Sequence, residues 1–441
     1  MPNRFKWRLG LPRALRFGDP PVTADRRHPL LAIGHGPQSQ PPLQIAEAAS
    51  GLCEIIWLID ESVPENAFTS RLLKKVGIVA NIAGLSPGEV AALLREYSPD
   101  GVVTYRDDDI VLFSLIAAEM GLDYHTPEVA QRLVDKLLQR QALRSGGLPT
   151  PLCWKIPADR DPAAIEAVAA TVEYPAVLKP RTSSGGQYTM PVADIGDLVR
   201  QVALLPPQAG GETGMFVEQY LPSLATGPGE RFADYLSVES LVASGEISHL
   251  AVNGRFPLSA PFRETGFFIP ADLSRAQAEA VLEVATAALH ALGVRTGGFH
   301  TEIKLTPDGP RVIEVNGRIG GGVPEMLFQA SGVSIFKLSM RVALGEPVVV
   351  EGPIPCDRIG WCFLIQPPIS ARRFVGVEGL DRLAERPGVN RVLLNRTPGD
   401  PIDLWDGTFH YIYSVYGVAT DYDEVVEINR FLHEEVSVVY G

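Results

Sequence analysis

The segment from residue 299 to residue 322 constrains the fold most strongly, because apolar and polar side chains alternate along both of its halves. In the first half, Phe299, Thr301, Ile303 and Leu305 alternate with His300, Glu302 and Lys304; in the second, Ile313 and Val315 alternate with Glu314, Asn316 and Arg318. A period of two residues is that of a β-strand. Between the halves, the sequence TPDGP at residues 306–310 is rich in turn-forming residues. The pattern predicts a β-hairpin with its polar residues on one face.

One face of this hairpin brings two acidic residues together. If residues 306–310 form the loop, Leu305 faces Arg311 and Glu302 lies directly across from Glu314. The Cβ atoms of directly opposed residues are about 4.5 to 5.5 Å apart, and like charges at that distance destabilise a sheet. We therefore expect a cation between the carboxylates, and oxygen ligands favour Mg²⁺ or Mn²⁺.

Two further residues extend the same face. Asn316 can add a neutral oxygen ligand, and Arg318 can hold a carboxylate or a phosphate through two parallel hydrogen bonds. The alternative is a surface hairpin with ordinary charged residues. The apolar positions on the other face and the glycine-rich exit at residues 320–322 favour a buried functional face.

Length and charge limit the class of protein. A chain of 441 residues exceeds one typical core and predicts two to four domains. No apolar run approaches the length of a membrane span, so we expect no transmembrane helix. The net charge of -13 argues against general nucleic-acid binding, and a phosphate ligand has to meet locally placed cations.

The N-terminal arm, residues 1–28, is basic but lacks the uninterrupted apolar core and the cleavage site of a secretory signal. We therefore expect a cytoplasmic protein with a solvated arm. The four cysteines are scattered, without a C-x-x-C pair or a nearby histidine at zinc spacing, which predicts buried thiols.

Strand-like and helix-like segments alternate from residue 29 to residue 125. HPLLAIGHG, CEIIWLID and DGVVTYRDDD are typical of strands, and the segments between and after them are typical of helices. This alternation predicts a parallel βαβ unit of Rossmann-like type. Residues 126–148 predict one helical stretch, and the rest of the chain mixes hairpins with helices. The fold class is therefore α/β and α+β, with several domains.

Lys179 ends an apolar strand just before the loop SSGGQY, residues 183–188. Gly185 and Gly186 let backbone N–H groups approach phosphate oxygens, Ser183 and Ser184 add hydroxyl donors, and Lys179 supplies a charge. A plain hairpin turn is the alternative. The loop is not a Walker motif, because its lysine precedes the glycines.

Two more residues matter only in combination with these. Lys136 lies on the expected helix, where a surface lysine needs no functional explanation. Glu218 ends the strand MFVEQYL, where an outward carboxylate and the backbone of residues 219–221 could pair with the edge of a purine.

Together, in this order and spacing, these features resemble the ATP-grasp superfamily over residues 126–345. The resemblance implies that Lys136 and Lys179 contact the nucleotide phosphates and that the loop carrying Ser183, Ser184, Gly185 and Gly186 closes over them. It further implies that adenine is held by Glu218, Gln219, Tyr220 and Leu221, and magnesium by Glu302, Glu314 and Asn316. Arg318 matches the position that contacts the acyl phosphate or the acid substrate. The family's ribose-contacting acid is not clearly matched, because Tyr235 stands at the nearest position with Asp234 beside it.

The resemblance also predicts the domain boundaries. We expect an N-terminal βαβ domain at 29–125, a central subdomain at 126–222, a C-terminal subdomain with the metal site at 223–345 and a small α+β unit at 346–441. A homodimer is compatible with this superfamily.

The wording HTEIKL, IEVNGRIGGG and SVESLV resembles the amino-acid and dipeptide ligase branch. By that resemblance His300 lies near the amino substrates, although a core histidine is an equal alternative. The predicted activity is an ATP-dependent joining of a small-molecule carboxylate to an amine, with amino acids or peptides as substrates and ATP and Mg²⁺ (or Mn²⁺) as cofactors. The alternatives are an ATP-grasp enzyme with another acceptor, such as bicarbonate or a purine-pathway amine, and a nucleotide-binding regulator without catalysis.

Overall fold

The computed structural model describes residues 28–224 and 231–441, so the predicted basic arm lies outside the described residues except for His28. The N-terminal domain is a sheet of four parallel strands in the order β3-β2-β1-β4, which confirms the predicted βαβ unit. Its elements are β1 (Leu30–Gly34), α1 (Pro42–Ala49), β2 (Glu54–Ile59), α2 (Asn66–Leu73), β3 (Ile78–Asn81), α3 (Pro87–Arg95), β4 (Gly101–Thr104), η1 (Asp107–Asp109) and α4 (Ile110–Met120).

The helical stretch predicted at 126–148 is two helices, α5 (Pro127–Val134) and α6 (Lys136–Ser145). The break is at Asp135, whose backbone is extended and whose carboxylate accepts hydrogen bonds from the N–H groups of Leu137 and Leu138. A side-chain cap of this kind starts a new helix. Lys136 is therefore the first residue of α6 and not a residue in the middle of a helix.

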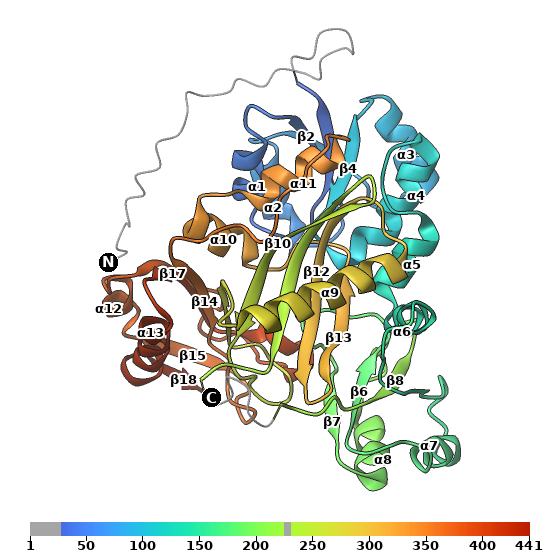
Figure 1. Ribbon diagram of the computed structural model, residues 1–441, viewed down its shortest axis with the longest axis vertical. Helices are drawn as coiled ribbons and strands as arrows, with labels where there is room; N and C mark the ends of the chain where they lie inside the picture. The colour runs from blue at the N-terminus through green and yellow to red at the C-terminus, as the bar shows by residue number, and fades with distance from the viewer. Residues whose placement is uncertain (1–27, 225–230) are drawn as a thin grey trace.

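A small antiparallel sheet follows, in the order β5-β8-β6-β7, with two helices packed on it. Its elements are β5 (Cys153–Lys155), α7 (Pro162–Ala169), β6 (Ala176–Pro180), β7 (Met190–Val192), α8 (Ile195–Leu204) and β8 (Met215–Gln219). Figure 1 shows this unit at one end of the long axis and the N-terminal domain at the other.

Between them lies a sheet of eight strands in the order β13-β12-β9-β10-β11-β14-β17-β16. Its elements are β9 (Tyr235–Ala243), β10 (Glu246–Arg255), β11 (Gly266–Ile269), α9 (Arg275–Leu292), β12 (Gly297–Thr306), β13 (Gly309–Asn316), α10 (Val323–Ser331), α11 (Ile335–Ala343), β14 (Ile359–Leu364), β16 (Val389–Leu394) and β17 (Tyr413–Ala419). The remaining elements are β15 (Phe374–Glu378), α12 (Leu380–Ala384), η2 (Leu404–His410), α13 (Tyr422–Glu435) and β18 (Ser437–Tyr440), with β15 and β18 paired. The segment 346–441, predicted as a unit of its own, thus adds three strands to the same sheet.

The predicted hairpin is β12 and β13, and its central pairing is confirmed: Glu302 is the partner of Glu314. The predicted five-residue turn is wrong, because Thr306 pairs with Gly309 and only residues 307–308 form the turn. A β-bulge shifts the register between Glu302 and Ile303. The extra residue in the bulge offsets the shorter turn, so the two acids still face each other.

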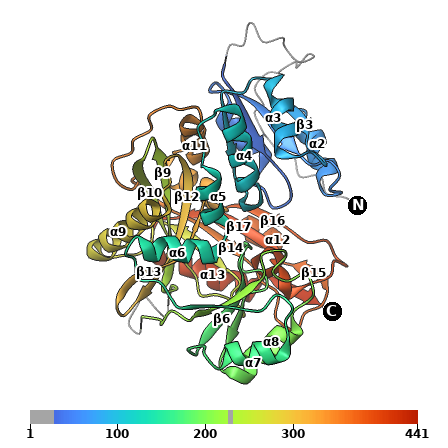
Figure 2. The ribbon, with the colours of Figure 1, turned by 90° about the vertical axis from the view of Figure 1, so that its right-hand side faces the viewer.

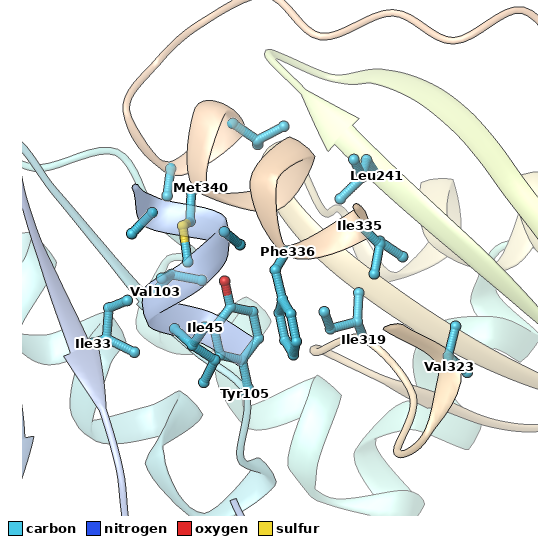
Figure 3. Packing of buried hydrophobic residues seen from close by; sticks show 14 of the residues in the cluster. Ile33, Ile45, Val103, Tyr105, Leu241, Ile319, Val323, Ile335, Phe336 and Met340 are labelled. Carbon is cyan, nitrogen blue, oxygen red and sulfur yellow. The ribbon is translucent and has the colours of Figure 1, made fainter. Parts of the chain in front are cut away.

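The N-terminal domain is joined to the large sheet by an apolar core that crosses between them (Figure 3). Ile33 and Val103 of the parallel sheet, Phe336 and Met340 of α11, and Leu241 of β9 belong to this one cluster. Figure 2 shows α11 lying between the two sheets. These two parts therefore share a core and behave as one body. No helix in the described residues combines the length and the apolar character needed to cross a bilayer.

We predict that Phe336→Ala lowers the free energy of unfolding by about 3 to 5 kcal/mol, because it removes a buried ring from the shared core. The Phe336 ring is buried and packs edge-on against Tyr105 at 5.0 Å. Urea unfolding followed by fluorescence measures the change. The matched control is Phe328→Ala on α10, where the ring is 56% exposed, and a loss as large as that of Phe336→Ala would contradict the prediction.

Candidate active site

Helix α6 connects the large sheet to the small one (Figures 1 and 2). The Gln139 amide donates to the carbonyl of Val315 and accepts from its N–H, both at 2.8 Å. This pair of bonds imitates a neighbouring strand at the outer edge of β13, which is the last strand of its sheet. On the other side, the N–H of Lys136 donates to the carbonyl of Arg181 after β6, at 2.9 Å. One helix thus fixes the separation of the two sheets.

A buried group of charges lies at the same junction. Glu218 of β8 accepts two hydrogen bonds from Arg140 of α6 and one from Lys179 of β6, each at 3.0 Å. Burial opposes ionisation of the carboxylate, but the two cations outweigh burial and lower the pKa of Glu218 to about 2. The prediction that the Glu218 carboxylate points outward is therefore wrong. Arg140, which closes this group, carried no signal in the sequence.

An ion pair joins Lys136, one of the predicted phosphate-binding residues, to Glu314. Glu314 lies on the acid face, the side of the hairpin that carries Glu302, Glu314 and Asn316. The Lys136 ammonium lies 2.9 Å from a carboxylate oxygen of Glu314 and donates to the carbonyl of Ser183 at 2.7 Å. Lys136, the first residue of α6, therefore contacts both β13 and the glycine loop, residues 183–188. The predicted phosphate residues Lys136 and Lys179 both border this junction, as does the loop itself.

The glycine loop connects β6 to β7. Gly185 and Gly186 have φ of 59° and 72°, in the left-handed region that glycine adopts without strain. Ser183 and Ser184 precede them and are half-buried. The loop therefore has the backbone freedom that the sequence predicted.

The acid face has the donor set of a hard cation. Glu302 and Glu314 are cross-strand partners, and Asn316 uses its amide N–H to donate to the carbonyl of His300 at 3.4 Å, so its carbonyl oxygen is directed elsewhere. Burial disfavours the charge on Glu302, but the hydrogen bond and charge of His300 together with Arg255 lower its pKa to about 2. Two carboxylates and an amide oxygen fit Mg²⁺ or Mn²⁺. Across the described ranges, no group of three or more His, Cys, Asp or Glu residues has metal-binding geometry, so the metal set stays a prediction.

His300 belongs to a buried polar chain. Its Nδ1 is hydrogen-bonded to Glu239, whose carboxylate also accepts from Asn253 and from the N–H of Gly320, both at 2.9 Å. Its Nε2 lies 3.0 Å from a guanidinium nitrogen of Arg255. Burial favours the neutral ring, but Glu239 outweighs burial and raises the pKa of His300 to about 9. The predicted substrate histidine is therefore held in a fixed orientation.

Arg318 meets a residue that the sequence reasoning did not single out. Its guanidinium donates twice to one carboxylate oxygen of Asp107, at 3.0 and 2.7 Å. Asp107 is in η1, directly after the carboxyl end of β4, which is where parallel sheets bind ligands. The run Asp107-Asp108-Asp109 at that position was the signal available. For Glu239 the sequence signal was weaker, namely an acidic residue within the otherwise mostly apolar strand SVESLV.

Asp234 and Tyr235 are the two residues nearest to the unmatched ribose position in the sequence. Asp234 has one carboxylate oxygen 2.9 Å from Lys304, and among the described residues its other oxygen is buried without a partner. Lys304 lies over the ring of Tyr220, within the predicted adenine segment, at 5.6 Å. Asp234 therefore borders that segment, while the hydroxyl of Tyr235 is buried.

The chain is similar in sequence to a known domain family and to known proteins. Residues 172–325 match the family described as the ATP-grasp domain. An uncharacterized protein, y4rH, of Sinorhizobium fredii is 27% identical over 71% of this chain and 63% of its own length. Carnosine synthase 1 of Mus musculus is 28% identical over 74% of this chain and 40% of its own length. The chain thus spans less than two thirds of these relatives.

The same fold is present in a solved structure. The crystal structure of an L-amino acid ligase from Bacillus licheniformis superposes with a TM-score of 0.76, at 23% identity, over 95% of this chain and all of that one. The N-terminal parallel sheet, the small sheet and the large sheet therefore form an ATP-grasp fold.

We predict that Glu218→Gln destabilises the protein by about 3 to 5 kcal/mol, because Arg140 and Lys179 are then buried without a counter-charge. Thermal unfolding at neutral pH measures the loss. Glu166→Gln, an exposed change on α7 of the same unit, serves as the control. Equal melting temperatures for the two variants would show that the buried charges do not hold the junction.

We also predict that His300 titrates near pH 9 and that Glu239→Gln lowers its pKa. Burial lowers the pKa of the ring, and the Glu239 carboxylate is the main group that opposes this effect. Since the folded pKa lies above the ordinary value of 6.5, the stability from His300 is complete below pH 6.5 and is lost as pH rises through about 9. NMR of ring-labelled histidine measures the titration. Glu246→Gln, exposed at the start of β10, is expected to leave it unchanged; an unchanged pKa in Glu239→Gln would refute the assignment.

Proposed function

We propose that this protein is an ATP-dependent ligase that joins a carboxylate to an amine, with amino acids or peptides as substrates; the match of residues 172–325 to the ATP-grasp domain supports the proposal. One observation carries the proposal: Lys136 bonds both the glycine loop and Glu314, the partner of Glu302. The residues that we assign to the phosphates and to the metal therefore lie at one junction. The similarity to carnosine synthase and to an L-amino acid ligase supports the same reaction class.

The reaction has two steps. A carboxylate is a poor electrophile, so it first takes the γ-phosphoryl group of ATP, forming an acyl phosphate and releasing ADP. The amine then attacks the carbonyl carbon, the C–O bond to phosphate breaks, and phosphate and a proton leave. Positioning and charge neutralisation account for most of the catalysis of phosphoryl transfer.

We assign roles to this chain's residues accordingly. Lys136 and Lys179 neutralise the phosphates, and the loop with Ser183, Ser184, Gly185 and Gly186 covers them. We assign the backbone of Gln219, Tyr220 and Leu221 to adenine, next in the chain to Glu218, which Arg140 holds. Asp234 is the best candidate for the ribose contact. Burial lowers the pKa of Lys179, although Glu218 opposes that effect.

The acceptor side has its own residues. Glu302, Glu314 and Asn316 would hold Mg²⁺, which would supply neutralisation of phosphate charge when bound. Arg318 would orient the acid and stabilise the oxyanion of the tetrahedral intermediate, an electrostatic role often worth about 3 to 4 kcal/mol. His300 would border the amine. A cytoplasmic location and a homodimer are part of the proposal and rest on sequence reasoning alone.

Two other functions compete with this one. An ATP-grasp enzyme with bicarbonate or a purine-pathway amine as acceptor would share the nucleotide site. A nucleotide-binding regulator would have lost an acid or a lysine, and the acids and lysines of the proposed set are all present.

We predict that sustained ADP release over many turnovers requires both an acid and an amine, and that Glu314→Ala slows it by about 100-fold or more, because one removed electrostatic group typically costs that much. A screen of amino-acid pairs supplies the substrates. Glu279→Ala, an exposed change on α9, is the control. An undiminished rate in Glu314→Ala would refute the metal assignment.

The regulator is distinguished by the same screen. If Mg²⁺ with ADP raises the melting temperature while no pair gives ADP release from ATP, binding without ligase activity is favoured. Release with one substrate and bicarbonate would favour the carboxylating alternative.

A further inference from the structure

The glycine loop is held by a segment of the chain that lies far away in sequence. The carbonyl of Gly185 accepts a hydrogen bond from the N–H of Thr408 at 2.8 Å, and the N–H of Tyr188 donates to the carbonyl of Trp405 at 3.0 Å. The rings of Tyr188 and Trp405 stack with centroids 5.9 Å apart and planes 25° apart. Thr408 and Trp405 belong to η2, and neither has a role in the reaction as proposed above.

The contact between η2 and the loop is close enough to exclude a side chain. A Cβ atom at Gly407 would lie 2.3 Å from the carbonyl oxygen of Gly185 and 2.8 Å from the nitrogen of Gln187. A Cβ atom at Gly185 would lie 2.6 Å from the ring of Phe409. Gly407 also has a positive φ of 61°, which suits glycine. The two backbones therefore meet directly.

The η2 segment also makes hydrogen bonds that do not involve the glycine loop. His410 accepts from the N–H of Asp403 at 3.0 Å and is paired with the carboxylate of Asp406 at 2.5 Å. Arg396 donates to the carbonyl of Phe409 at 2.9 Å. The two bonds of His410 lie within residues 403–410 and stabilise the conformation of the segment, and the bond from Arg396 joins it to a residue outside η2.

Thr408 also connects the loop to the acceptor side of the site. Its hydroxyl accepts from the N–H of Glu264 at 3.0 Å. The Glu264 carboxylate lies 2.5 Å from Arg255, which in turn lies 3.0 Å from the ring of His300. A continuous chain of contacts thus runs from the glycine loop to His300.

We propose that η2 is the surface against which the glycine loop closes, called its seat below. Gly407 and Thr408 are positioning residues for the closed loop. The proposal rests on the proposed function in one respect, namely that the loop covers the nucleotide phosphates. A loop held on this seat would shield an acyl phosphate from water. Thr408, which bonds the loop, would also order the segment next to Arg255. Loop closure and the arrangement around His300 are then linked through one side chain.

Hydrogen–deuterium exchange on the nucleotide-free, full-length chain tests the seat without any reference to activity. Gly407→Ala places a Cβ atom against the backbone of the loop, and we expect the amide of Tyr188, which donates to Trp405, to exchange about fivefold faster or more, the effect of at least one lost hydrogen bond. Thr408→Val removes the hydroxyl that accepts from Glu264 but keeps the backbone bond to Gly185, so we expect faster exchange at the amide of Glu264 instead. Thr408→Ser keeps the hydroxyl and should match the wild type, as should Thr420→Val, an exposed change remote from the loop.

Kinetics then test whether the seat serves the reaction. We expect Thr408→Val to raise the KM for ATP several-fold and to increase the share of ADP released without amide product, with Thr408→Ser restoring both. If Gly407→Ala does not fold, Trp405→Ala, which removes the ring stacked on Tyr188, takes its place in the exchange measurement. Unchanged exchange at Tyr188 in these variants would overturn the seat. Faster exchange with no ligase activity in any variant or in the wild type would instead leave the seat standing and refute the proposed function.

Discussion

The ion cluster of Glu218 with Arg140 and Lys179 is the interaction on which the site depends. It fixes α6 to the small sheet, and the amide of Gln139 fixes the same helix to β13. Every predicted nucleotide group is therefore positioned relative to one helix. A buried ion cluster is poor evidence for stability by itself, because desolvation offsets much of its attraction. Its value here is geometric: two cations and one carboxylate leave positive charge at a junction within a chain of net charge -13.

The two junctions of the molecule differ in kind. The N-terminal domain and the large sheet share an apolar core that includes Phe336 and Met340, and packed apolar cores do not deform continuously. The small sheet is joined to the rest by polar contacts at α6 and by both polar and aromatic contacts at the seat of the glycine loop. Polar contacts can be exchanged for contacts with water or ligand at little net cost.

Sequence reasoning predicted the parallel domain, the hairpin and the acid pair, because each depends on a short repeating pattern. It was right about the pairing of Glu302 with Glu314 although it was wrong about the turn, since the bulge contributed the missing residue. It was wrong about the direction of Glu218. Arg140 and Asp107 lie in other elements than their partners, and no local period reports such meetings. Contacts between elements, such as Thr408 with Gly185, depend on the assembled fold.

The pairing of Gln139 with Val315 has a consequence for solubility. An edge strand with open N–H and C=O groups is a template for another chain, and β13 is such a strand. A single side chain closes part of that edge by presenting the amide geometry of a backbone. Any opening of the small sheet that carried α6 away would uncover it. The helix that organises the site therefore also shields part of this sheet edge from pairing with another chain.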